Sequence, residues 1–147
     1  GTRSGRRRRA AILESRWRME ASALLDAHVQ LKRIYTSMNE AMDITQQLAE
    51  AVDRDDQVTI QMLVAMRQEP VDKMSQAKRV LDLQKDALPE TDRLRLEALL
   101  KGGPPEDAAE EAFVKQAGMN DRLLKQLADL DRVLNKKLTR DKSIYEH

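Results

Sequence analysis

The segment from about Ala21 to Val52 is the feature that most constrains the fold of this 147-residue chain. Neither Gly nor Pro interrupts it, and its apolar or small side chains recur at steps of three and four residues. This spacing places them on one face of an α-helix. At ~1.5 Å per residue, the helix is about 48 Å long. Because a single helix of this length cannot cover its own apolar face, the sequence predicts a helical bundle.

A second apolar stripe with the same period follows the acidic turn at 53–56. The turn ends the first stripe, and one of its aspartates is expected to cap the next helix. The second stripe extends from Ile60 to Leu88 and contains Pro70. A proline inside a helix removes one backbone donor and crowds the preceding turn. Since the apolar period continues in phase on both sides of Pro70, we expect a kink rather than a break.

Two further helices are predicted in the second half of the chain. A short one, from about Glu90 to Lys101, ends at Gly102-Gly103-Pro104-Pro105, the strongest break in the sequence. The last helix spans about Glu106 to Arg140. The four segments predict an all-α fold, in which three long helices form an antiparallel, coiled-coil-like bundle and the short helix is a connector.

Length and composition indicate one helical domain, residues 19–141, followed by a frayed tail, 142–147. Charged residues make up 35% of the chain and aromatic residues 3%, a mixture typical of bundles and coiled coils. Residues 1–18 differ, because they contain seven arginines and one glutamate. This basic arm has three interpretations: it binds nucleic acid or another anionic surface, it is a solvated tail without a role, or it lies outside the native protein, with Met19 as the true start.

The sequence offers no catalytic residues, no cofactor site and no metal site. There is no cysteine, which excludes disulfides and thiolate chemistry and fits a cytoplasmic protein. His28 and His147 are far apart and lack further ligands at helical spacing, whereas zinc needs three or four. The acidic turn 53–56 lacks the glycine and closing glutamate of a calcium loop. No apolar run reaches the length of a membrane span.

The methionines have two interpretations. Six of the seven are expected on or near the apolar stripes: Met38, Met42, Met62, Met66, Met74 and Met119. Flexible thioethers fill irregular gaps in cores, and they also suit an exposed groove that adapts to varied apolar partners.

The last helix is the candidate binding element. Its apolar stripe is interrupted at Gln116, Gly118 and Asn120 and becomes strong again from Leu123 onward. The stripe either completes the bundle or lies open to a partner helix. The candidate partner-binding residues are Asn120, Leu123, Leu124, Leu127, Leu130, Leu134 and Tyr145. A buried Asn120 is expected to set the register of packing, as polar residues do in coiled coils.

The chain resembles the small helical flagellar export chaperones of the FlgN/FliT-like type over about residues 19–145. The resemblance lies in the long first helix, the acidic turn 53–56, the run Leu63-Val64-Ala65-Met66-Arg67 and the run Asn120-Asp121-Arg122-Leu123-Leu124. It implies a non-enzymatic cytoplasmic chaperone that binds amphipathic terminal helices of hook-associated proteins and escorts them to the export apparatus. Tyr145 is then a candidate contact for that apparatus, or an inert terminus.

Two other functions are compatible with the residues alone. A self-associating coiled-coil adaptor, such as a homodimer, would satisfy its apolar stripes with a second copy. Nucleic-acid binding would depend on residues 1–18, because the remainder of the chain has a net negative charge.

Overall fold

The computed structural model describes the backbone of residues 19–145 and the side chains of residues 19–139. The basic arm, with its three interpretations, lies outside the described residues. Every regular element within them is a helix, which confirms the all-α prediction: α2 (Ala21–Asp53), α3 (Gln57–Asp86), α4 (Glu90–Leu100) and α5 (Ala108–Tyr145). The backbone of α5 stays helical to Tyr145, past the predicted end at Arg140, so residues 142–145 continue the helix.

The acidic turn joins α2 to α3 through two complementary caps. At the end of α2, the N–H groups of Asp55 and Asp56 bond the carbonyls of Val52 and Ala51, while Asp55 adopts a left-handed φ of 54°. Asp56 then caps α3: its carboxylate accepts hydrogen bonds from the hydroxyl and N–H of Thr59, which lower the pKa of Asp56. The expected capping role of this turn is confirmed.

Pro70 lies inside α3 without ending it. The helix is continuous from Gln57 to Asp86, and Pro70 is buried with Leu63, Ala77 and Leu81 on the packed side. The proline has no N–H to give to the carbonyl four residues earlier. Because its ring contributes to the buried face, it acts as a core residue, and the alternative of a break near Glu69 is wrong.

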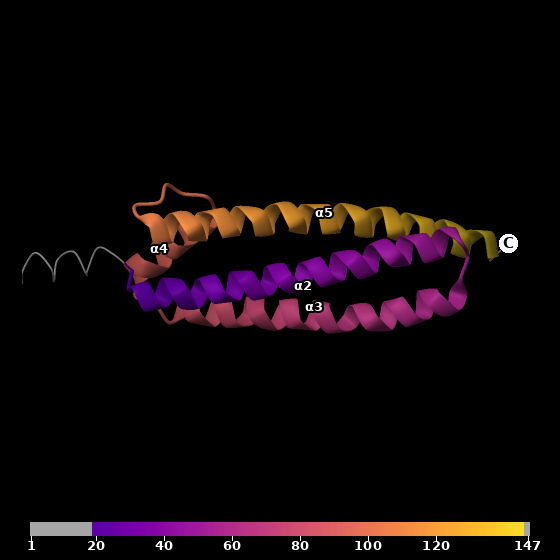
Figure 1. Cartoon of the computed structure of the whole chain (residues 1–147), viewed down its shortest axis with the longest axis horizontal. Coiled ribbons are helices and arrows are strands. Elements are labelled where there is room, and N and C mark those ends of the chain that lie inside the picture. Colours follow the sequence, from indigo (N-terminus) through magenta and orange to yellow (C-terminus); the bar gives the residue numbers. More distant parts are fainter. Residues whose placement is uncertain (1–18, 146–147) are drawn as a thin grey trace, which may run out of the picture.

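The long helices lie side by side along one axis, with α2 between the other two (Figure 1). α3 folds back antiparallel to α2. α5 packs mainly on α2 and touches α3 little. The Asn120 amide of α5 bonds the carbonyl of Leu31, and Lys137 further along α5 contacts Asp53 at the end of α2. The two helices therefore run parallel. The predicted antiparallel three-helix bundle is therefore not confirmed in that form, because α5 is parallel to its main neighbour.

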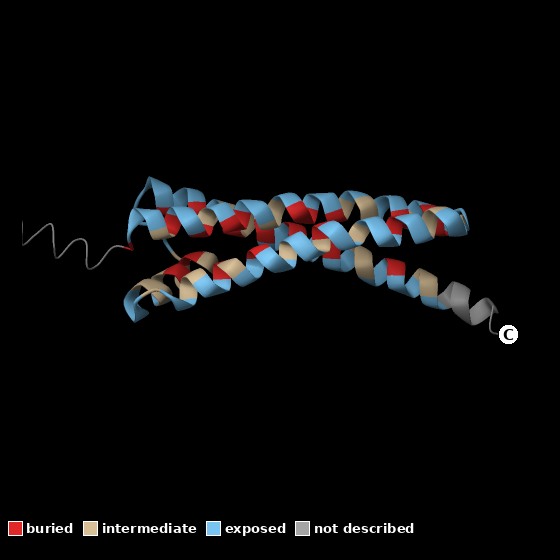
Figure 2. Cartoon of the chain, turned by 90° about the horizontal axis from the view of Figure 1, so that it is seen from below, coloured by how far each residue is buried: buried red, intermediate tan, exposed pale blue. Residues whose placement is uncertain are grey.

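Two apolar clusters hold the bundle near its ends. The larger one gathers residues of α2, α3, α4 and α5 around Phe113: Met19, Leu24, Ala27, Leu31, Leu81, Leu96, Leu99, Phe113 and Ala117. The second lies beside the α2–α3 turn and contains Leu48, Ala51, Val52, Leu63 and Leu134. Figure 2 shows buried positions along each long helix alternating with exposed ones. Each long helix therefore buries one side and leaves the other uncovered.

The connector α4 is fixed by its own caps. Gly102, with φ of 89°, and Gly103 bond the carbonyls of Leu99 and Ala98, which closes the last turn of α4. At the start of α5, the Glu110 carboxylate accepts hydrogen bonds from Arg95 of α4 and from the N–H of Glu106. These contacts tie α4 to α5 across the Gly-Pro loop.

Two glycine substitutions are expected to act in opposite directions on stability. Gly102→Ala is expected to lower the free energy of unfolding by about 1–2 kcal/mol, because an L side chain is disfavoured at a left-handed φ. Gly118→Ala is expected to raise it by about 0.5–1 kcal/mol, since Gly118 lies inside α5 and a Cβ there meets only the flexible end of Arg122 at 3.3 Å. Urea denaturation followed by circular dichroism measures both; equal effects of the two changes would contradict the assigned geometry.

Candidate functional site

The predicted binding stripe of α5 is mostly covered by α2. Leu123, Leu127 and Leu134 are buried, as is Asn120. The Asn120 amide donates to the carbonyl of Leu31 at 2.9 Å, and its side-chain oxygen accepts a hydrogen bond from Gln116. A partner reaches these four side chains only if α5 moves off α2.

Two residues of the stripe are accessible in place. The Leu124 side chain is 50% exposed, and Leu130 is half-buried. Helical spacing puts them on opposite flanks of the buried row, with Leu124 on the same side as Asp131, seven residues later. The Tyr145 side chain lies outside the described residues. The structure thus separates the predicted stripe into a buried row and an accessible margin.

An ion pair connects α5 to α3 across α2. One terminal nitrogen of Arg67 lies 2.6 Å from both carboxylate oxygens of Asp131. Both side chains are partly buried, so this charge-assisted bond is screened less by solvent than a surface pair. This pair links α3 directly to α5, and it helps to fix how α5 lies relative to the α2–α3 hairpin.

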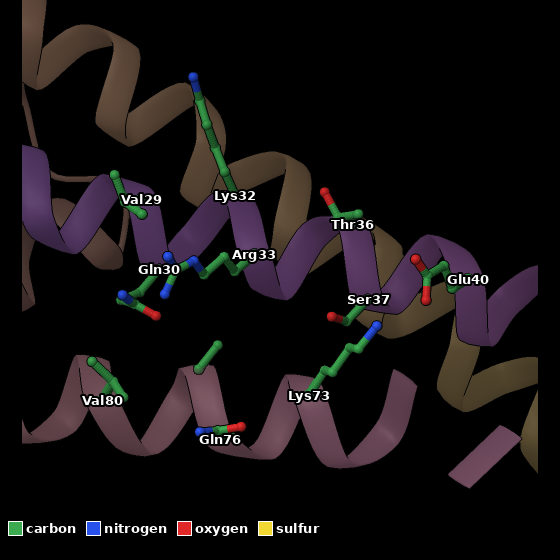
Figure 3. Close-up of a pocket in the computed structure, with 11 residues that line it drawn as sticks. Val29, Gln30, Lys32, Arg33, Thr36, Ser37, Glu40, Lys73, Gln76 and Val80 are labelled. Carbon is green, nitrogen blue, oxygen red and sulfur yellow. The ribbon is translucent and has the colours of Figure 1, made fainter. Parts of the chain in front are cut away.

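The hairpin groove lies between α2 and α3, and Figure 3 shows its lining residues with α5 passing behind α2. Its volume is about 510 Å³. The lining residues are Val29, Gln30, Lys32, Arg33, Thr36, Ser37 and Glu40 of α2, and Lys73, Gln76, Ala77 and Val80 of α3. Three of them are cationic and one is anionic, so the wall of the groove carries net positive charge.

One buried polar atom in the groove lacks a partner. The Gln30 side chain is only 6% exposed, and within the described residues its amide oxygen accepts no hydrogen bond. A buried acceptor without a donor costs free energy comparable to that of a lost hydrogen bond. The groove therefore contains a polar group that a ligand with a donor would satisfy.

Exposed apolar side chains continue the groove in both directions. On α3, the face of Lys73, Gln76 and Val80 extends at steps of three or four residues to a row of exposed side chains: Val58, Met62, Met66 and Leu83. On α2, the face of Val29 and Arg33 extends to Leu25, which is also exposed. We call this surface, from Val58 to Leu83 on α3 and Leu25 to Glu40 on α2, the hairpin face.

The methionines divide between the two interpretations. Met38 is buried, whereas Met62 and Met66 are 53% and 50% exposed on the hairpin face. Sequence reasoning assigned apolar positions of α3 to its core stripe and did not separate this second row. The available signal was the four-residue spacing of Val58, Met62 and Met66, which puts these residues on a face beside that of Leu63 and Pro70.

No three His, Cys, Asp or Glu residues in the described part of the chain are arranged to hold a metal ion. His28 instead packs edge-on against the Phe113 ring, with the centroids 5.8 Å apart. None of the described helices has an apolar stretch long enough to cross a bilayer.

Comparison of the chain with protein families, with curated proteins and with solved structures finds no match.

His28 is expected to make stability depend on pH. Burial, with a smaller contribution from the Lys32 cation, lowers the pKa of His28 below its ordinary value of 6.5. The unfolded chain therefore takes up a proton more readily than the folded one, and stability is expected to fall as the pH drops below about 6.5. Urea midpoints at pH 7.5 and 5.5 measure the change. His28→Gln should reduce this dependence and His147→Gln should retain it; the same pH dependence in His28→Gln would exclude His28 as its source.

Proposed function

We propose that this chain is a non-enzymatic, cytoplasmic chaperone that binds amphipathic helical segments of flagellar hook-associated proteins and escorts them to the export apparatus. The observation that carries the proposal is the row of exposed, large apolar side chains along the hairpin face. Val58, Met62 and Met66 project from α3 at four-residue spacing. Rows of this kind on an exposed helix suit the binding of another apolar helix.

The bundle provides long, rigid surfaces of a suitable shape. A subunit segment that will later join a coiled coil has an apolar stripe that must be covered until assembly. A helix laid along α2 or α3 covers several turns of such a stripe at once. Because the exposed rows are separated by charged and polar residues, the interface remains moderate in size, and release stays possible.

We assign different roles to the members of the α5 stripe. Leu124 and Leu130 contact the client directly from the margin of α5. Asn120, Leu123, Leu127 and Leu134 hold α5 on α2 in a coiled-coil-like packing and fix the position of that margin. Tyr145 remains a proposed contact for the export apparatus.

A self-associating adaptor is the second candidate function. The same exposed rows favour it, since two copies that pair face to face bury them as well as a client does. The two functions differ in the oligomeric state of the free chain. Nucleic-acid binding through residues 1–18 is a third candidate function, which the described residues do not test.

The direct test combines light scattering with titration of a client. We expect the free full-length chain to be monomeric and to form a 1:1 complex with the terminal helical segment of a hook-associated protein from the same genome. Leu124→Asp is expected to weaken that complex about tenfold, because it places a charge in an apolar contact while the half-exposed site tolerates it in the free fold.

Leu94→Asp is the matched control. Leu94 is exposed to a similar extent, 53%, but it lies on α4, outside the α5 stripe and the hairpin face. Its complex should keep the affinity of the unchanged chain. A stable dimer that Leu124→Asp dissociates would instead favour the adaptor, and absence of binding to every hook-associated segment would exclude the chaperone function.

A further inference from the structure

The central part of the hairpin face carries cationic side chains, which its two ends lack. Lys32 and Arg33 of α2 and Lys73 of α3 line the groove there. Among the described residues, no carboxylate lies within ion-pairing distance of Lys32 or Arg33, while Lys73 pairs with the exposed Glu69 at 3.2 Å. Arg33 therefore remains available in the middle of the groove, whereas the Lys32 side chain extends away from α3 (Figure 3).

The ends of the same face are apolar. Towards α4, Val29 and Val80 line the groove, and Leu25 and Leu83 lie one turn beyond them. Because α2 and α3 are antiparallel, these four residues meet at one end. Towards the α2–α3 turn, Met66, Met62 and Val58 form the other end. The face thus has an apolar–cationic–apolar order along the hairpin axis.

We propose that the hairpin face is the docking surface for a partner helix that has acidic residues in its middle turns and apolar residues towards both ends. Val58 and Leu83 are 25 positions apart on α3, so the row between them is about 37 Å long and fits a helix of similar length. The groove between two antiparallel helices is the position that a further helix takes in a bundle. This proposal depends on the helix-binding function proposed above and names the chemistry of its partner.

Each part of the groove has a complement in such a helix. Central carboxylates pair with Arg33 and Lys73, and the guanidinium of Arg33 offers a bidentate geometry. A Ser, Thr, Asn or Gln of the partner donates to the buried Gln30 oxygen, which receives no hydrogen bond from the described residues of this chain. The terminal apolar side chains cover Leu25 and Leu83 at one end and the adaptable Met62 and Met66 at the other. The cations select the partner, and the apolar ends supply most of the affinity.

The test uses two synthetic 25-residue helical peptides that differ only in charge. Both have leucines on one face of their outer turns and one central glutamine; one has four central glutamates and the other four central lysines. Fluorescence anisotropy with the full-length chain is expected to give about tenfold tighter binding of the glutamate peptide. The double change Arg33→Glu/Lys73→Glu, at exposed positions, should reverse this preference.

A matched double change controls for net charge. Lys125 and Lys136 are exposed on α5, so Lys125→Glu/Lys136→Glu alters the charge equally outside the hairpin face and should preserve the preference. Binding is located by a dye at Thr36→Cys, which is the single thiol because the chain has no cysteine. Its emission should change on binding of the glutamate peptide, whereas a dye at Asn135→Cys should not respond.

Several results would overturn the proposal. These are equal affinity for the two peptides, an unchanged preference in Arg33→Glu/Lys73→Glu, a silent dye at Thr36→Cys, or a dimer of this chain that buries the groove. If hook-associated segments still bind and Leu124→Asp still weakens them, the client binds at the Leu124 flank of α5 and the hairpin face is excluded as its site. If the glutamate peptide binds as described but no hook-associated segment does, the surface stands and its client belongs to another class of protein.

Discussion

The fold depends on the packing of both other long helices against α2. Since α3 and α5 touch each other little, α2 must present apolar or small residues over a wide arc. Its buried set includes Met38, Ala41, Thr45 and Leu48, at steps of three and four residues. Thr45 is tolerated there because its hydroxyl bonds the Ala41 carbonyl and leaves its methyl group for packing. α3 and α5 each pack mainly against α2, so each keeps an exposed flank.

Polar contacts define the register within this arrangement. Apolar clusters at the two ends hold the helices together, but one leucine packs nearly as well as the next after a shift of one turn. Asn120 bonds the Leu31 carbonyl, Asp131 binds Arg67, and Lys137 binds Asp53. A shift of α5 by one turn breaks all three and leaves Asn120 buried without its backbone acceptor. Asn120 is thus a positioning residue of the fold, whatever partner α5 contacts.

Periodicity predicted most of the buried apolar positions on the three long helices. The leucines 123, 127 and 134 are buried, and α3 continues through Pro70, as the phase of its apolar residues indicated. Periodicity does not say which helix covers a face. It therefore did not predict that α5 packs on α2 rather than on α3. Nor did it predict that α2 covers most of the candidate binding residues of α5. The contact of Asn120 with the Leu31 carbonyl joins residues 89 positions apart, a separation that no local pattern encodes.

The exposed apolar side chains of the hairpin face lower the solubility of the free chain. Their presence therefore favours a binding role for this face. Lys or Glu at positions 62 and 66 would support an exposed helix equally well, because their helix propensities match that of Met. Selection for stability alone would not retain Met62 and Met66 half exposed beside Val58. Such side chains contribute free energy only when another surface covers them. The cation in the middle of the same face limits which surfaces can do so, since an apolar helix without central carboxylates must remove water from Arg33 without pairing it.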